Sequence, residues 1–283
     1  MNSKKLSLSH DVHEDGKKFD DLLQEFYNDP STKYLNYLII GSWGDCFETS
    51  PESIIKNLVA NKHKLPNLEG IYVGDMDSEE CEISWIIQCD LSPLLQAFPD
   101  LKELRVKGSS GLRLSNLKHN KLETLIIECG GLGKDVLHDI ETSNLSNLKR
   151  LLLYLGVEDY GFDASIEDLR PFMKSGLFPN LRYLGLVDSE IQDEIAIEIA
   201  QASVLDQIEI LDLSLGTLTD KGAEALLNSD KIKKLKFLDL NYHYMSDEML
   251  EKITCMGVNI DVSNQQKTKE YDDELFRYPA VTV

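Results

Sequence analysis

The sequence predicts an α/β coil in which short parallel strands alternate with return segments. A block of the form Leu-x-x-Leu-x-Leu recurs along the chain. Its last three full copies begin at Leu181, Ile208 and Leu235, a constant 27 residues apart, and each is followed by an apolar residue, one further residue and an aspartate. A fixed period in the twenties with this consensus is typical of a leucine-rich-repeat solenoid. We therefore expect a horseshoe with a parallel concave β-sheet and a mostly helical convex side.

The strands are expected where the blocks lie. Within a block the fourth and sixth positions are apolar and alternate with polar or variable residues, which is the pattern of a half-buried strand. A short last strand over residues 260–262 is expected to close the stack. Five earlier blocks precede the three periodic ones, and they begin at Leu35, Leu68, Leu101, Leu122 and Leu148.

The connections between blocks are expected to differ along the chain. Parallel strands need a crossover, usually a helix, and the last three crossovers begin at Asp193, Asp220 and Asp247. We expect these carboxylates to cap the first free amides of their helices. Only 21 residues separate the block at 101 from the block at 122, which predicts an extended or 3₁₀ return. Insertions are expected at 77–97 and 157–177, where the spacing is 33 residues.

The flanks differ from the repeats. Residues 1–33 form a polar N-terminal segment, in which 1–16 are expected to be disordered and 19–27 to form a capping helix that ends before Pro30. The solenoid is expected over 34–263, as one continuous array. Residues 264–283 are expected to be a C-terminal tail or a cap, because terminal repeats usually need a cover.

Composition limits the class of partner and the setting. The chain has 283 residues, with 29 basic and 49 acidic side chains and a net charge of −20. Such a charge repels phosphate backbones, so we expect no nucleic-acid partner. No apolar run approaches the ~20 residues that span a bilayer, so no membrane association is expected. The five cysteines have no C-x-x-C spacing and no signal sequence is visible, which together indicate a reduced, cytoplasmic setting.

Four segments resemble a known family. They are 82–95 (EISWIIQCDLSPLL), 191–196 (IQDEIA), 211–220 (LDLSLGTLTD) and 244–249 (YMSDEM). From about residue 65 to the end, the chain resembles a bacterial family of cytoplasmic leucine-rich-repeat proteins. Its repeats are similar to the ribonuclease-inhibitor subtype, and its genes often lie beside those of WGR-domain proteins. The resemblance implies a fold and a bacterial cytoplasm, but no activity and no functional residues.

We expect no catalytic, cofactor-binding or metal site. The run Gly130-Gly-Leu-Gly-Lys-Asp135 lacks the spacing of a phosphate-binding loop and has Asp in place of the Mg²⁺-binding hydroxyl. The segment that begins at Asp75 resembles the start of a calcium loop but has no glycine at the sixth position and no glutamate at the twelfth, so we interpret it as a solvated acidic insertion. None of the six histidines has metal-ligand spacing, and His243 is interpreted as a turn residue, with a contact or pH-sensing role as the alternative.

The concave strand face is the predicted binding surface. Positions three, five and seven of each block point out of the coil, because side chains alternate along a strand. Asp212 and Asp239 are expected to stack in register, with Asp261 as a third member. The alternative is that these residues only pack across neighbouring strands. The candidate partner-binding residues are Tyr72, Arg105, Lys107, Arg150, Tyr154, Tyr183, Asp212, Phe237 and Asp239.

The sequence therefore predicts a non-enzymatic scaffold that binds an unknown protein partner on its concave face. Tyrosine and arginine are enriched where binding energy is concentrated, which favours this interpretation. One alternative is a small-ligand or enzymatic site at the insertions 77–97 and 157–177, which would require a cleft with convergent polar groups. The other is a homo-oligomeric structural module. The sequence leaves the oligomeric state open.

Overall fold

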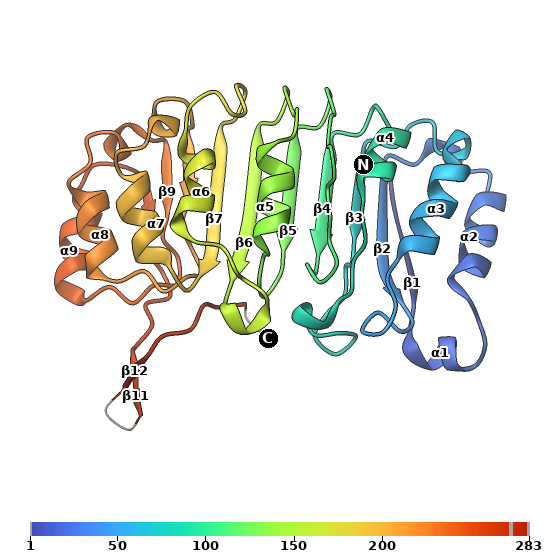
Figure 1. Ribbon diagram of the computed structural model, residues 1–283, viewed down its shortest axis with the longest axis horizontal. Coiled ribbons are helices and arrows are strands. Elements are labelled where there is room, and N and C mark those ends of the chain that lie inside the picture. Colours follow the sequence, from blue (N-terminus) through green and yellow to red (C-terminus); the bar gives the residue numbers. More distant parts are fainter. Residues whose placement is uncertain (1, 272–273, 282–283) are drawn as a thin grey trace. The chain divides into compact units, whose positions relative to one another are not determined.

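Each Leu-x-x-Leu-x-Leu block of the sequence contains a strand in the computed structural model of the protein (Figure 1). The structure describes residues 2–271 and 274–281. The chain divides into two units. Among the described residues, the first holds 2–129 together with 138–148, and the second holds 130–137 together with those between 149 and 281. The boundaries 34–263 for one solenoid stay a prediction.

The first unit contains a parallel sheet whose strands follow chain order. No helix lies between its last two strands, as the short spacing predicts. The strands are β1 (Ser3–Leu8), β2 (Tyr37–Trp43), β3 (Gly70–Val73), β4 (Glu103–Lys107) and β5 (Thr124–Glu128). The helices are α1 (His10–Glu14), α2 (Phe19–Asn28), α3 (Glu52–Ala60) and α4 (Ser92–Ala97), and the 3₁₀ turns are η1 (Thr32–Tyr34), η2 (Lys62–Lys64) and η3 (Ile83–Trp85). Helix α5 (Lys134–Glu141) has residues in both units.

The second unit repeats this plan: its strands also pair in parallel in chain order, and an antiparallel hairpin lies near its end. Its sheet is made of β6 (Arg150–Gly156), β7 (Tyr183–Ser189), β8 (Ile210–Asp212), β9 (Phe237–Asp239) and β10 (Ile260–Asp261), and its hairpin of β11 (Lys269–Tyr271) and β12 (Glu274–Phe276). The helices are α6 (Ile166–Leu169), α7 (Gln192–Ile199), α8 (Asp220–Leu227) and α9 (Asp247–Thr254). The 3₁₀ turns are η4 (Glu158–Tyr160), η5 (Arg170–Met173), η6 (Ser203–Asp206) and η7 (Ile232–Lys234).

The core of each unit lies between its strands and its helices. The fourth and sixth positions of the eight full blocks are completely buried, as the alternation predicts. Burial of one such aliphatic side chain stabilises the folded state by ~1.5–3 kcal/mol. The residues at these positions are Leu38, Ile40, Ile71, Val73, Leu104, Val106, Leu125, Ile127, Leu151, Leu153, Leu184, Leu186, Leu211, Leu213, Leu238 and Leu240.

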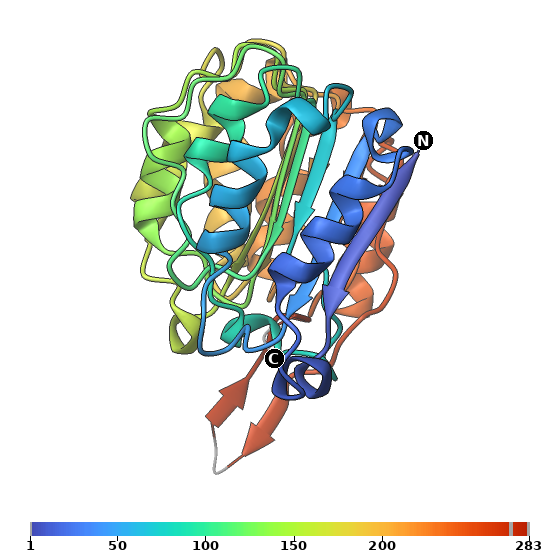
Figure 2. The same cartoon turned by 90° about the vertical axis from the view of Figure 1, so that its right-hand side faces the viewer.

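The helices of each unit cover one face of its strands. In the first unit α2 and α3 lie on one side of β1 and β2 (Figure 2), and in the second α7, α8 and α9 lie on one side of β7, β8 and β9 (Figure 1). We call the opposite face of each sheet, which carries positions three, five and seven of the blocks, the open face of that unit. No helix within 2–271 and 274–281 is long and apolar enough to cross a membrane.

The expectation that residues 1–16 are disordered is wrong for residues 3–14. Residues 3–8 form β1, which pairs in parallel with β2, and His10–Glu14 form α1. Leu6 and Leu8 are buried while the residues between and before them are exposed, so β1 follows the same alternation as the later strands. Most residues of this segment are polar, so two alternating leucines are too short a pattern to predict a strand. Helix α2 spans 19–28, where the sequence predicts a capping helix.

The aspartates Asp193, Asp220 and Asp247 lie in the first turns of their helices as predicted, but the prediction that they cap these helices is wrong. Thr219 and Ser246 cap α8 and α9 with their own hydroxyls. Asp193 reaches the next repeat instead, where it accepts hydrogen bonds from the Thr219 hydroxyl (2.6 Å) and from the Thr219 and Gly222 amides. Asp220 does the same with the amide and hydroxyl of Ser246, both at 2.7 Å. These first-turn carboxylates therefore link neighbouring repeats.

The C-terminal segment returns onto the second unit after the hairpin β11–β12. The Tyr278 amide donates to the Tyr244 hydroxyl at 3.0 Å, and Pro279 is buried. The Ala280 amide donates to the Leu215 carbonyl at 2.8 Å. The Val281 amide donates to Asp188 Oδ1 at 2.8 Å. Residues 278–281 therefore form a strap held to the unit by backbone hydrogen bonds.

Candidate functional site

The open face of the first unit is organised around a stacked arginine. The strand register places Tyr72 beside Arg105, and the Arg105 guanidinium carbon lies 4.4 Å from the centre of the Tyr72 ring. Arg105 Nε also donates to Glu128 Oε1 at 2.5 Å. Tyr72 is only 6% exposed as a result. Its expected exposure is therefore wrong, because the neighbouring cation covers its ring.

Lys107 lies on the same strand and is half-buried. Its Nζ donates to the Met76 carbonyl of the neighbouring loop. Next to Arg105 and Lys107, the register places Ile126 and Glu128 on β5. The two cations that sequence reasoning selected in this unit are thus brought together, and both already have intramolecular partners.

The open face of the second unit has a similar stack that leaves its cation more accessible. Arg150 and Tyr183 are register partners, with the Arg150 guanidinium carbon 4.2 Å from the centre of the Tyr183 ring. The Tyr183 hydroxyl donates to Asp212 on the next strand. Burial and the Asp212 charge raise the pKa of Tyr183 well above its ordinary value, so it stays a neutral donor. Arg150 itself remains exposed.

The predicted ladder of aspartates is confirmed. Asp212 pairs in register with Asp239, and Asp239 with Asp261. Each carboxylate accepts the amide of the residue two positions later, at Ser214, Asn241 and Ser263. Asp212 is buried, so its expected exposure is wrong: it is occupied by this turn and by the Tyr183 hydroxyl.

Asp239 differs from the other members of the ladder. Its pKa is raised to about 6, first by burial and then by the charges of Asp212 and Asp261 on either side. Only the hydrogen bond from Asn241, at 3.0 Å, works in the opposite direction. A cation that approached Asp239 would relieve this repulsion between like charges.

A half-exposed apolar row lies across the open face of the second unit. Tyr183, Ile210 and Phe237 occupy equivalent positions on β7, β8 and β9, and the register makes them successive neighbours. All three are half-buried, and so is Tyr154 on β6, which pairs with Val187. Packing between neighbouring strands accounts for the covered part of these side chains, and the remainder faces away from the helices.

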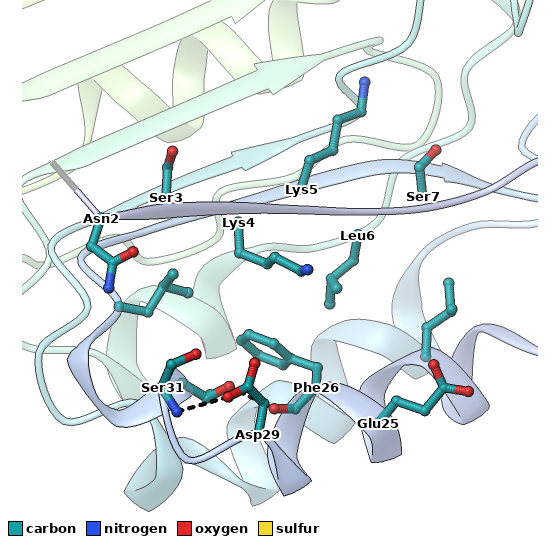
Figure 3. Close-up of a pocket in the computed structure, with 13 residues that line it drawn as sticks. Asn2, Ser3, Lys4, Lys5, Leu6, Ser7, Glu25, Phe26, Asp29 and Ser31 are labelled. Atoms are coloured by element: carbon teal, nitrogen blue, oxygen red, sulfur yellow. Dashed lines mark hydrogen bonds between the residues drawn. The ribbon is translucent and has the colours of Figure 1, made fainter.

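Cavities lie both within and outside the insertions at which a small-ligand site is the alternative prediction. A cavity of about 300 Å³ lies at the insertion 77–97, lined by Phe47, Cys81, Glu82 and Trp85. Another, of about 360 Å³, lies between β1 and α2, away from both insertions (Figure 3). It is lined by Lys4, Glu25 and Asp29 among others. The Asp29 carboxylate accepts the Ser31 amide, and this hydrogen bond holds the pKa of Asp29 below its usual value. Within residues 2–271 and 274–281, no group of three or more His, Cys, Asp or Glu side chains is arranged to hold a metal ion.

His243 is a structural residue of a turn. It is fully buried, its Nε2 lies 2.9 Å from the Val262 carbonyl, and the Met245 amide donates to its Nδ1. Burial lowers its pKa, which favours the neutral ring. Its Nε2 therefore links this turn to the segment that follows β10, and its Nδ1 fixes the turn itself.

Sequence reasoning considered the insertion that carries Trp85 only as a possible small-ligand site, and it missed the exposed aromatic residue Phe47. Phe47 follows a strand and has no distinguishing pattern around it. Sequence reasoning also did not identify Asp188, a buried carboxylate at the end of β7.

Comparison with known proteins agrees with the repeats. A family model described as a leucine rich repeat matches residues 208–227. No curated protein matches the sequence. A crystal structure of a Bacteroides fragilis protein, solved as a structural-genomics target, has 42% sequence identity and a TM-score of 0.88, over 93% of this chain and 75% of that one. An internalin from Listeria monocytogenes has 17% identity and a TM-score of 0.43, over 84% of this chain and 58% of that one. The chain is an α/β leucine-rich-repeat protein and belongs to the same family as the Bacteroides fragilis protein.

Proposed function

We propose that the protein is a non-enzymatic scaffold that binds a protein partner through the open face of its second unit. Repeat arrays of this kind commonly use their long exposed surfaces for protein–protein interaction. The observation that carries the proposal is the half-exposed row Tyr183, Ile210 and Phe237 beside the exposed Arg150. Aromatic and arginine side chains on a rigid surface are where binding energy is usually concentrated.

The chemistry of this face favours a partner with both apolar and charged groups. Arg150 is already oriented by the Tyr183 ring, so little side-chain entropy is lost when it binds a carboxylate. Asp239 offers a negative charge at the other end of the row, and its pKa is raised by burial and by neighbouring charges of the same sign. A cation of the partner would therefore be favoured there. Tyr154 and Phe237 supply apolar area between these charges.

The remaining candidate residues have supporting roles in this proposal. Tyr72 orients Arg105 in the first unit, and Asp212 orients Tyr183 in the second. Arg105 and Lys107 add half-buried cations on the open face of the first unit. We propose that Arg150, Tyr154, Tyr183, Phe237 and Asp239 contact the partner, that Asp212 acts through Tyr183, and that Tyr72, Arg105 and Lys107 form a separate candidate surface of the first unit.

The proposed setting is a bacterial cytoplasm, with repeats of the ribonuclease-inhibitor subtype and without nucleic-acid, membrane or cofactor binding. The Bacteroides fragilis relative supports a bacterial origin. All five cysteines are free and four are buried, which suits a reducing compartment. The net charge of −20 disfavours nucleic acid.

The proposal is tested by affinity capture and direct titration. Wild-type protein and the Arg150→Glu and Phe237→Ala variants are immobilised, and proteins retained from the source cells are quantified by mass spectrometry. A protein retained by the wild type is then purified and titrated. We expect each variant to weaken its binding by roughly tenfold or more. Ile197→Ala is the matched control, because Ile197 is 39% exposed on α7 of the same unit. Equal binding by all four proteins would refute the proposal.

A further inference from the structure

We infer that the loops after β2 and β3 form a second docking surface, which fits a peptide segment of a partner that carries one bulky apolar side chain between lysine or arginine residues. This surface belongs to the first unit and does not depend on the proposed function of the open face. The loops concerned are residues 44–51 and 74–91.

The centre of this surface is apolar and exposed. Trp85 is 60% exposed and Phe47 is 39% exposed. Together with Cys81 and Glu82 they line a cavity of about 300 Å³. A tryptophan that is left this open on an ordered turn is a frequent anchor of protein interfaces, because it can bury a large area at low entropic cost.

Hydrogen bonds hold the two loops together and make the surface preformed. The Ile87 amide donates to the Cys46 carbonyl at 2.9 Å, and the Cys46 and Cys81 thiols are hydrogen-bonded. Asp77 fixes the turn before Trp85 by accepting the Glu79 and Glu80 amides at 3.0 and 2.9 Å. A preformed surface loses little conformational entropy when a partner binds.

The charge around the cavity selects the partner. No lysine or arginine occurs in residues 34–55 or 74–101. The exposed acids of the two loops are Glu48, Asp77, Glu79, Glu80, Glu82 and Asp90. The nearby basic side chains are already engaged: Lys5 pairs with Asp75 at 3.0 Å, Lys107 donates to the Met76 carbonyl, and His10 and His13 both contact Asp45 at 3.1 Å. The rim is thus strongly negative and complements a cationic segment.

An arginine in the partner can use both features of the surface. Its guanidinium can pair with a rim carboxylate and stack on the exposed face of the Trp85 indole. The neighbouring apolar side chain of the partner then fills the cavity beside Phe47 and Cys81. Charge alone does not account for this arrangement, because the cavity lining is mostly apolar.

The inference is tested with synthetic peptides and the full chain. The probe is a fluorescein-labelled peptide with one phenylalanine between two runs of arginines, followed by fluorescence anisotropy. Two comparison peptides replace the phenylalanine by alanine or the arginines by glutamates. Binding to the wild type is also followed by tryptophan emission. The chain has two tryptophans, and Trp43 is 5% exposed with its Nε1 bonded to the Thr49 carbonyl, so a shift to shorter wavelength reports Trp85.

We expect the arginine–phenylalanine peptide to bind and both comparison peptides to bind at least tenfold more weakly. Trp85→Ala and Glu82→Lys should each weaken binding of the first peptide by a similar factor. Tyr160→Ala is the matched control, since Tyr160 is a 37% exposed aromatic residue beside Glu158 and Asp159 in the other insertion, and it should bind as the wild type does.

Three results would overturn the inference: no binding by the wild type, equal binding of the alanine peptide, or equal binding by Trp85→Ala. Glu82→Lys keeps the tryptophan and changes only an exposed residue, so it reports on the rim even if Trp85→Ala folds poorly. Arg150→Glu should leave this peptide unaffected, which separates the inference from the proposed function of the open face.

Discussion

Replacing Asp188 by asparagine should change how the stability of the protein depends on pH. Asp188 is fully buried at the end of β7, where its backbone adopts a positive φ of 54°. Its Oδ1 accepts the Val281 amide, but its Oδ2 has no hydrogen-bond partner among the described residues. Burial raises the pKa of Asp188 from 3.8 to about 7, against the effect of the Val281 and Ala280 amides. An ionised Asp188 therefore opposes folding.

The ionisation of Asp188 determines the direction and the size of the change in stability with pH. Between pH 3.8 and about 7 the carboxyl is ionised in the unfolded chain and protonated in the folded one. Folding then takes up a proton, so the free energy of unfolding falls as pH rises through this range. A shift of this size corresponds to about 4 kcal/mol at most, at about 1.4 kcal/mol per pKa unit. Release of the strap 278–281 would let water reach Asp188. The stability lost on ionisation therefore cannot exceed the free energy with which the strap binds the unit.

An asparagine at this position would keep an oxygen that accepts the Val281 amide and would tolerate a positive φ, but it cannot ionise. We expect Asp188→Asn to match the wild type near pH 4 and to be more stable by roughly 2–4 kcal/mol at pH 8. Urea unfolding followed by circular dichroism at several pH values measures the difference. Asp230→Asn is the control for loss of an acid, because the Asp230 side chain is 92% exposed. Parallel pH profiles for wild type and Asp188→Asn would refute the reasoning.

Three further substitutions test the packing of the units. Leu240→Asp places a charge in the core of the second unit and should lower its free energy of unfolding by ~3 kcal/mol or more, measured by thermal melting; a wild-type melting curve would contradict the register. Gly156→Ala should cost more than about 1 kcal/mol in urea unfolding, because φ is +74° and the new Cβ would meet the Gly130 carbonyl. Arg113→Ala removes the bidentate partner that lowers the pKa of Asp139, so the variant should lose about 1–3 kcal/mol of stability at pH 7 in urea unfolding. This loss should shrink as the pH falls and Asp139 becomes protonated, and a loss that stays constant with pH would contradict the reasoning.

The sequence predicts the strands of this fold well, for a simple physical reason. Every repeat needs a buried leucine or similar aliphatic residue at its fourth and sixth positions. The same pattern therefore occurs eight times, and each occurrence makes the assignment of the others more certain. Strand β1 contains only one such pair, Leu6 and Leu8, within a polar segment, and a single short alternation cannot be distinguished from chance. The helix positions follow as well, because crossovers must lie between the strands.

The details of the candidate site are less predictable, since they depend on neighbours that alternation does not specify. Alternation places Tyr72 and Asp212 on the outer side of their strands, but Arg105 covers the one and Tyr183 binds the other. The same holds for Asp193, whose sequence position suits a helix cap and whose actual partner, Thr219, lies one repeat later. Such contacts between adjacent strands or helices require the register between repeats.

The way the charges are used decides which of them can bind a partner. Most outward charges near the sheets are engaged internally: Asp193 and Asp220 join repeats, Asp212 and Asp261 hold turns, and Arg105 binds Glu128. A partner can gain little from groups that already have good hydrogen bonds, because it would have to displace them. The available groups are those that the repeats leave over, namely the exposed Arg150, the desolvated Asp239 and, outside the sheets, the acidic rim around Trp85. For this reason a partner should discriminate far more strongly between variants at these three places than between variants of the many other acids on the surface.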